Sequence, residues 1–311
     1  MRKQTLYTRA MKLMGNHFEL SVVGNREDWA LERIEAGVKE IQRIERLLTT
    51  FSEDSETNLI NRHAGIAPVT VSREIFELIE RCNRISQITQ GAFDISYGSI
   101  DKRFWNFDPS MTSLPDAKTA KEMVRLIDYK NIVLDHARTS VMLKEKGMRI
   151  GFGGIGKGYA AEKAKAVMRD MNVQAGVVNA SGDLTAWGYQ PAGKPWTIGI
   201  VDPDAPGTVI GMLDITDTAV ATSGNYEKYA IVDGKRYSHT INPRTGLPVT
   251  GIKSVTVVCP YAEIADAMTT PVMVMGVKAG LHMINQLDHL EAVIIDDDGQ
   301  VHRSNHIHLT Q

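Results

Sequence analysis

The 311-residue sequence has few cysteines, almost no net charge and no long hydrophobic segment. Its two cysteines, Cys82 and Cys259, lie far apart and match no metal-binding spacing, so we expect buried free thiols. A formal net charge of −2 gives no support for binding to nucleic acid or to a charged membrane surface. No apolar run reaches the length of a membrane-spanning helix. The sequence therefore predicts no nucleic-acid partner and no transmembrane segment.

The N-terminal segment is polar. Residues Met1 to Arg9 lack the apolar core of a signal peptide, so we expect a cytoplasmic location for the chain as given. The alternative is a periplasmic, membrane-associated location, if a leader was removed before this numbering begins. The length suits one large domain or two closely packed ones, with a substantial hydrophobic core.

Hydrophobic periodicity predicts a chain in which helices and strands are partly segregated. Helices are predicted from Asn25 to Leu48, from Ser72 to Gly91, from Asp116 to Ile127, over 159–171 and over 262–287. Strands are predicted within 5–23 and 131–143, and at 177–180, 196–201, 208–215, 219–222, 229–232, 254–259 and 292–295. This order predicts an α+β fold with mixed β-sheets and helices packed on them. We expect one domain over 1–311, divisible into a helix-rich part (1–170) and a β-rich part (171–311).

A glycine-rich stretch stands between a predicted strand and a predicted helix. Glycines occupy positions 151, 153, 154, 156 and 158, and Lys157 lies among them. Backbone N–H groups at a helix N-terminus, together with the helix dipole, favour a bound anion such as a phosphate. Lys157 adds a positive charge where phosphate oxygens would lie. The alternative is a tight turn that only allows close packing of the helix.

Two nucleotide-binding fingerprints overlap this stretch, and neither is complete. The Walker A pattern fails because Gly158 stands where Ser or Thr must bind magnesium. The dinucleotide pattern Gly-x-Gly-x-x-Gly is met by Gly151, Gly153 and Gly156, but it requires an acid that closes the next strand. Asp183 lies too late in the sequence for that role. A generic dinucleotide oxidoreductase is thus a weak alternative.

Two later segments carry polar side chains of the kind that catalysis uses. Asp266 and Thr270 are four residues apart, so they share one face of a helix and offer hard oxygen ligands that suit Mg²⁺. A purely structural role as helix caps is the alternative. His239 precedes a turn that contains Pro243 and Gly246; taken alone, such a histidine is more often a surface or structurally satisfied residue than a base.

Taken together, eight short segments occur in an order that resembles the ApbE-type flavin transferases, the FAD:protein FMN transferases. The segments are Leu13–Asn16, Ser55–Asn61, Gly91–Asp94, Gly153–Ala160, Val178–Leu184, Ala221–Glu227, His239–Gly246 and Ala265–Thr270. Each segment is weak evidence alone, but eight in order over nearly the whole chain are specific. The resemblance displaces the dinucleotide oxidoreductase interpretation and implies an ApbE-like fold.

The resemblance implies an enzyme that binds FAD and magnesium, and that transfers the FMN moiety to a Thr or Ser hydroxyl of an acceptor protein, with release of AMP. By this similarity, the nucleotide site is lined by Met14, Phe51, Ala92, Phe93, Asp94, Lys157 and Ile241. The metal ligands implied are Gly154, through its carbonyl, Asp266 and Thr270. His239 corresponds to the proposed general base, which would activate the acceptor hydroxyl.

The sequence also departs from the family pattern. Gly151 stands where the family usually has an acid, which removes one expected contact to the nucleotide or the metal. Other departures are Asn16, Gly156, Asn225, Asn242 and Pro271. Two alternative functions therefore stay open: a magnesium-dependent FAD pyrophosphatase that yields FMN and AMP, and a non-catalytic FAD-binding protein.

Overall fold

The computed structural model describes residues 4–100, 113–205, 207–225, 229–232, 235–238 and 240–310. Its largest element is an eight-stranded sheet with the strand order β1-β2-β6-β7-β10-β13-β14-β15. The strands are β1 (Thr5–Leu13), β2 (Asn16–Gly24), β6 (Gly176–Ala180), β7 (Asp183–Trp187), β10 (Thr218–Gly224), β13 (Ile252–Cys259), β14 (Glu291–Asp296) and β15 (Val301–Arg303). Neighbouring strands of this sheet pair antiparallel.

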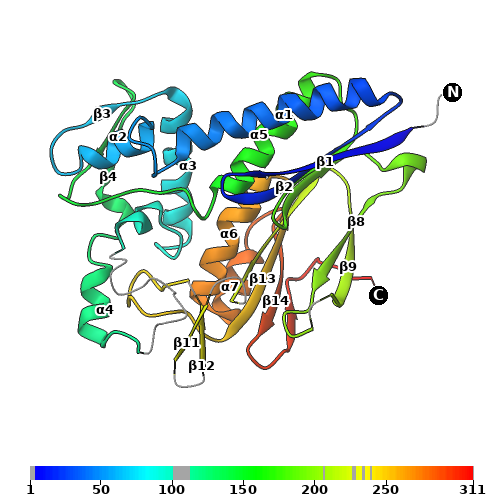
Figure 1. Cartoon of the computed structure of the whole chain (residues 1–311). Helices are drawn as coiled ribbons and strands as arrows, with labels where there is room; N and C mark the ends of the chain where they lie inside the picture. The colour runs from blue at the N-terminus through cyan, green and yellow to red at the C-terminus, as the bar shows by residue number, and fades with distance from the viewer. Residues whose placement is uncertain are drawn as a thin grey trace.

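Three helices cover one face of the sheet (Figure 1): α1 (Glu27–Leu48), α5 (Gly156–Asp170) and α6 (Ala262–Met275). The buried side of α1 carries apolar residues at three- and four-residue steps, including Ile34, Ile41 and Ile44, as the sequence predicts. On the other face, the hairpin of β8 (Trp196–Val201) and β9 (Val209–Ile215) packs through a second apolar cluster. The sheet is therefore enclosed between two layers.

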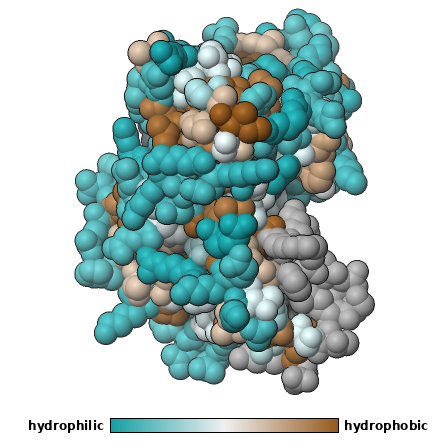
Figure 2. Space-filling view, turned by 90° about the vertical axis from the view of Figure 1, so that its left-hand side faces the viewer, coloured by the Kyte–Doolittle hydropathy of each residue, from teal (hydrophilic) through white to brown (hydrophobic). Residues whose placement is uncertain are grey.

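A smaller lobe extends from the end of α1 (Figure 1). It contains α2 (Glu56–Arg62), α3 (Arg73–Ile88) and a three-stranded sheet of β3 (Val69–Thr70), β5 (Ser140–Leu143) and β4 (Ile132–Asp135). The remaining elements are α4 (Ala117–Met123), α7 (Val277–Ile284), β11 (Tyr229–Val232), β12 (Lys235–Ser238) and the 3-10 turns η1 (Ile95–Ser99), η2 (Tyr129–Asn131) and η3 (Pro191–Gly193). Figure 2 shows this end of the molecule, where apolar patches are separated by hydrophilic side chains.

The predicted α+β class, with helices packed on sheets, is confirmed. Several element boundaries differ from the prediction; α4, for example, ends at Met123 rather than at Ile127. α1 begins at Glu27, and its N-cap is Arg26 without a side-chain cap, so Asn25 does not cap it. The predicted helix over 262–287 is two helices, because Gly276 adopts a φ of 84° after α6 and interrupts the helical backbone.

The main hydrophobic cluster joins both halves of the chain, since it includes Ile41 from the first half and Val257 from the second. The division at residue 170 stays a prediction. α1, although 22 residues long, carries charged side chains along its length, and no described helix has the hydrophobic stretch that a bilayer span requires.

A side chain of the smaller lobe, that of Asn61, forms two hydrogen bonds to the segment that leads into the glycine-rich turn. The amide of Asn61, on α2, donates from Nδ2 to the carbonyl of Ile150 at 3.1 Å and accepts from the Ile150 N–H at 2.7 Å. Asn61 and Ile150 are both buried, so the Asn61 side chain supplies the hydrogen bonds that a neighbouring β-strand would otherwise make to the backbone of Ile150. The predicted motif Ser55–Asn61 therefore has a structural role beside the turn.

We expect Asn61→Ala to lower the free energy of unfolding by about 2–3 kcal/mol, because it leaves a buried donor and a buried acceptor of Ile150 without partners. Asn305→Ala, on an exposed residue, is the matched control and should change stability by less than about 0.5 kcal/mol. Urea unfolding followed by circular dichroism measures both. Equal effects of the two substitutions would show that the Asn61 bonds contribute nothing specific.

Candidate active site

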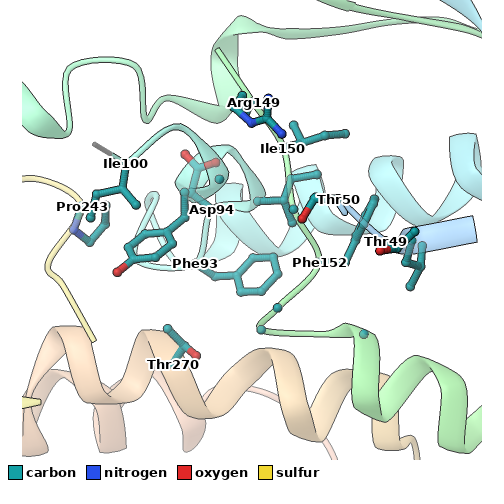
Figure 3. Close-up of a pocket in the computed structure, with 18 of the residues that line it drawn as sticks. Thr49, Thr50, Phe93, Asp94, Ile100, Arg149, Ile150, Phe152, Pro243 and Thr270 are labelled. Carbon is teal, nitrogen blue, oxygen red and sulfur yellow. The ribbon is translucent and has the colours of Figure 1, made fainter. Parts of the chain in front are cut away.

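A cavity of about 960 Å³ lies where the glycine-rich turn, the end of α1, the η1 turn, α6 and the segment 240–243 meet. Most of the predicted site residues line it: Met14, Phe51, Ala92, Phe93, Asp94, Gly154, Ile241 and Thr270. Figure 3 shows Thr270 rising from α6 toward Phe93, with Ile100 and Pro243 at one end of the cavity and Thr49 and Thr50 at the other. Residues from distant parts of the sequence therefore line one cavity.

The N-terminus of α5 packs directly on α6 at Gly158. The backbone N–H of Gly158 donates to Oδ2 of Asp266 at 2.9 Å. A Cβ atom at position 158 would lie 2.1 Å from the carbonyl oxygen of Ala262 and 2.7 Å from Cβ of Asp266. Only glycine permits this approach, which explains physically why the Ser or Thr of a Walker A loop is absent here.

Oxygen donors of α6 face the turn. A Cβ atom placed on Gly154 would lie 3.7 Å from Oγ1 of Thr270, so the Gly154 backbone and the Thr270 hydroxyl are close neighbours. The carboxylate of Asp266 lies one helical turn earlier, is 4% exposed, does not line the cavity and accepts from the N–H of Gly158 in the first turn of α5. One carboxylate with neutral oxygens is a donor set that suits Mg²⁺, which usually keeps waters and shares substrate phosphates. In the described ranges, no group of three or more His, Cys, Asp or Glu side chains is placed to hold a metal.

Lys157 does not line the cavity. Its ammonium forms an ion pair with Oδ2 of the buried Asp183, whose Oδ1 accepts from the backbone N–H of Thr222 at 3.0 Å. Burial raises the pKa of Asp183, and the ammonium of Lys157 opposes this effect. The predicted contact of Lys157 with the nucleotide stays a prediction. The role of Asp183 as its partner was missed, although both residues lie in motifs that the resemblance includes.

Asp94 lies in the cavity wall and organises its backbone. Its Oδ1 accepts from the N–H and the hydroxyl of Ser96, at 2.8 and 2.6 Å, and its Oδ2 accepts from the N–H of Tyr129 at 2.7 Å. Burial raises the pKa of Asp94 to about 6, against the opposing effect of these hydrogen bonds. The protonation state of Asp94 therefore affects the hydrogen bonds that hold two turns of the cavity wall.

The cavity has an apolar part at each end. One end is formed by Tyr97, Ile100 and Ile241; burial raises the pKa of Tyr97 to about 12, so its hydroxyl stays protonated. The other end includes Leu48 and Phe152. Phe51 is 97% exposed at this second end, so the cavity opens to solvent there. Tyr97 and Ile100 were missed from the sequence, where their only signal is their position one turn after the Gly91–Asp94 motif.

His239 lies outside the described residues, so its role as general base stays a prediction. The next two residues, Thr240 and Ile241, line the cavity. At the position of the missing acid, a Cβ atom on Gly151 would meet nothing nearer than 3.9 Å. Glycine is therefore not required sterically at 151, and a side chain would fit there.

We expect Gly158→Ala to lower the free energy of unfolding by about 3 kcal/mol or more, because its methyl group would overlap the Ala262 carbonyl. Gly153→Ala is the matched control in the same turn, since a Cβ atom there has no neighbour within 4 Å. It should change stability by less than about 1 kcal/mol. Denaturant unfolding distinguishes the two, and equal stabilities of the variants would contradict the close approach of α5 and α6.

The raised pKa of Asp94 predicts a pH effect on stability. Between pH 3.8 and about 6 the folded state binds a proton that the unfolded state releases, so stability is lost as the pH rises through this range. The unfolding free energy of the wild type minus that of Asp94→Asn should fall by up to about 3 kcal/mol from pH 4 to pH 7. Asp116→Asn is the control, because hydrogen bonds from Thr119 lower the pKa of Asp116, so the corresponding difference should stay nearly flat from pH 4 to pH 7 and change only at lower pH. A flat difference for Asp94→Asn would refute the assignment.

Known proteins match this chain over most of its length. The sequence profile of the ApbE family matches residues 14–294. The FAD:protein FMN transferase of Klebsiella pneumoniae (strain 342) is 32% identical over 297 residues, which cover 95% of this chain and 90% of that protein. The FAD:protein FMN transferase of Treponema pallidum (strain Nichols) is 28% identical over 317 residues, which cover 96% of this chain and 86% of that protein.

Solved structures show the same similarity. The ApbE protein of Thermotoga maritima is 30% identical and covers 97% of both chains with a TM-score of 0.88. The flavin transferase ApbE of Vibrio cholerae, at 22% identity, shares the fold with a TM-score of 0.85 and covers 97% of this chain and 98% of that one. The resemblance predicted from the ordered motifs is confirmed, and the chain belongs to the ApbE family.

Proposed function

We propose that this member of the ApbE family transfers the FMN moiety of FAD to the hydroxyl of a Thr or Ser residue in an acceptor protein, with magnesium, and releases AMP. The observation that carries the proposal is that Gly154 of the glycine-rich turn and Thr270 of α6 line one cavity, with Asp266 one helical turn from Thr270. Relatives named FAD:protein FMN transferase at up to 32% identity support it.

The shape of the cavity fits FAD. FAD has two planar ring systems joined by a pyrophosphate, and the cavity has apolar side chains at both ends with the glycine-rich turn and Thr270 between them. Its volume of about 960 Å³ lies within the range of ligand pockets, roughly 300–1,000 Å³. In this arrangement the pyrophosphate lies beside Gly153, Gly154 and Thr270, where backbone N–H groups can bind its non-bridging oxygens.

The residues of α6 and of the turn fit a magnesium ion, which would be held by Asp266, Thr270 and the carbonyl of Gly154. Bound there, the ion would neutralise phosphate charge. The scarcity of acidic ligands agrees with a metal that takes further oxygens from substrate phosphates and from water.

The proposed reaction is a substitution at the phosphorus of the FMN half. The acceptor oxygen forms a new P–O bond, the P–O bond to the AMP half breaks, and AMP leaves with the bridging oxygen. The acceptor hydroxyl loses its proton to His239, which the resemblance assigns as the base. A positioned base of this type contributes about 10²–10⁴-fold in rate.

The test is to mix the protein with FAD, Mg²⁺ and an acceptor that the Klebsiella pneumoniae relative is first shown to flavinylate, and to follow in-gel flavin fluorescence. We expect His239→Ala to lower kcat by about 10²–10⁴-fold.

Thr270→Val, which keeps the shape but removes the hydroxyl, should raise the Mg²⁺ concentration needed for half-maximal rate by about tenfold or more. Thr197→Val, on β8, is the control and should leave both values unchanged.

Different results would favour the alternatives. Release of AMP without an acceptor, and no labelled acceptor, would favour an FAD pyrophosphatase. Tight FAD binding with neither product, unaffected by His239→Ala, would favour a non-catalytic FAD-binding protein.

A further inference from the structure

A second recess, of about 430 Å³, adjoins the large cavity. The two share part of their lining, because Asp94 and Pro243 belong to both. The segment that follows position 239 passes from one to the other: Ile241 lines the large cavity, and Arg244 lines the recess. The recess and the large cavity therefore share a wall.

The lining of the recess differs in chemistry from the large cavity. It contains side-chain amides and charges of both signs, together with backbone; its residues include Gln87, Gln90, Asp128, Lys130 and Arg244. A lining of one sign would favour a small ion, and an apolar lining would favour a ring or an acyl chain. A polypeptide has a donor and an acceptor at nearly every residue, so it suits this mixture of groups.

The walls of the recess are held in place by hydrogen bonds within and between the segments that form it. Nη2 of Arg244 donates to the carbonyl of Gln90 at 2.8 Å. The N–H of Arg244 donates to Oδ1 of Asn242 at 2.9 Å. On the other side, the N–H of Lys130 donates to Oδ1 of Asp128 at 3.0 Å. Together with the bond from Tyr129 to Asp94, these contacts make a preformed site, which lowers the entropic cost of binding.

We infer that this recess binds the acceptor polypeptide, in the segment next to the hydroxyl that receives FMN. The inference rests on the proposed function, since a transfer needs a second substrate in contact with the first. A volume of about 430 Å³ lies in the lower half of the usual pocket range, roughly 300–1,000 Å³, and suits a short stretch of chain rather than a second dinucleotide.

The experiment blocks the recess after folding is complete. Gln87 is an exposed residue in the last turn of α3, and Gln87→Cys can be modified with biotin-maleimide. Cys82 and Cys259 are buried, so the new thiol reacts selectively. Arg84→Cys is the matched control: it is exposed on the same helix and lines neither cavity. The acceptor is again one that the Klebsiella pneumoniae relative flavinylates.

Modification of Gln87→Cys should raise the KM for the acceptor about tenfold or more, as expected for the loss of a few contacts worth about 1.4 kcal/mol. The KM for FAD should stay within about twofold, and modified Arg84→Cys should behave as the unmodified protein does.

An unchanged acceptor KM would overturn the inference while the transferase assignment stands. An equal rise in the KM for FAD would overturn it as well, because the recess would then belong to the nucleotide site. A wild-type protein that binds FAD but labels no acceptor would instead contradict the proposed function itself.

Discussion

The contact between Gly158 and Asp266 is the constraint on which the site depends. It joins the first turn of α5 to α6 by one hydrogen bond of 2.9 Å, at a separation that excludes any side chain at position 158. Because of this contact, α6 lies against the glycine-rich turn, and Gly154 and Thr270 line the same cavity. A larger residue would separate the two helices, and the backbone of the glycine-rich turn would then lie apart from Asp266 and Thr270.

Segments far apart in the sequence hold this junction from several sides. Asn61 fixes the strand-like residues before the turn, and the N–H of Gly151 donates to the carbonyl of Ile95 at 2.9 Å. After the turn, Lys157 pairs with Asp183, which also accepts from Thr222. Some of the motifs that define the family resemblance, such as Ser55–Asn61 and Val178–Leu184, therefore contribute residues that hold this turn in position.

Features that depend on local periodicity and motif order could be predicted from the sequence. Features that depend on contacts between distant residues could not. Helices such as α1 and α3 follow from their apolar spacing, and Ser72 caps α3 as expected. The break at Gly276 was missed because a lone glycine within a helical pattern gives only a weak signal. Within the site, eight of the predicted positions line one cavity. The pairing of Lys157 with Asp183 could not be predicted, since it depends on how β7 lies against α5.

The position of α6 itself is set by buried charges rather than by a cap of its own. Its N-cap, Tyr261, makes no side-chain cap, and Oε2 of Glu162 on α5 accepts from the N–H of Ala262 at 3.0 Å instead. The other carboxylate oxygen of Glu162 lies 3.0 Å from the buried ammonium of Lys165, which also donates to Thr185 at 3.1 Å. A buried charge of this kind is tolerated only when it is paired and hydrogen-bonded, so the pair has little freedom to move. Helix α6 is thus fixed to α5 at two points: at its first residue, Ala262, and one turn further on, at Asp266. Two fixed points on one helix define both its register and its rotation, and for this reason Thr270, another turn along, faces the glycine-rich turn rather than the sheet.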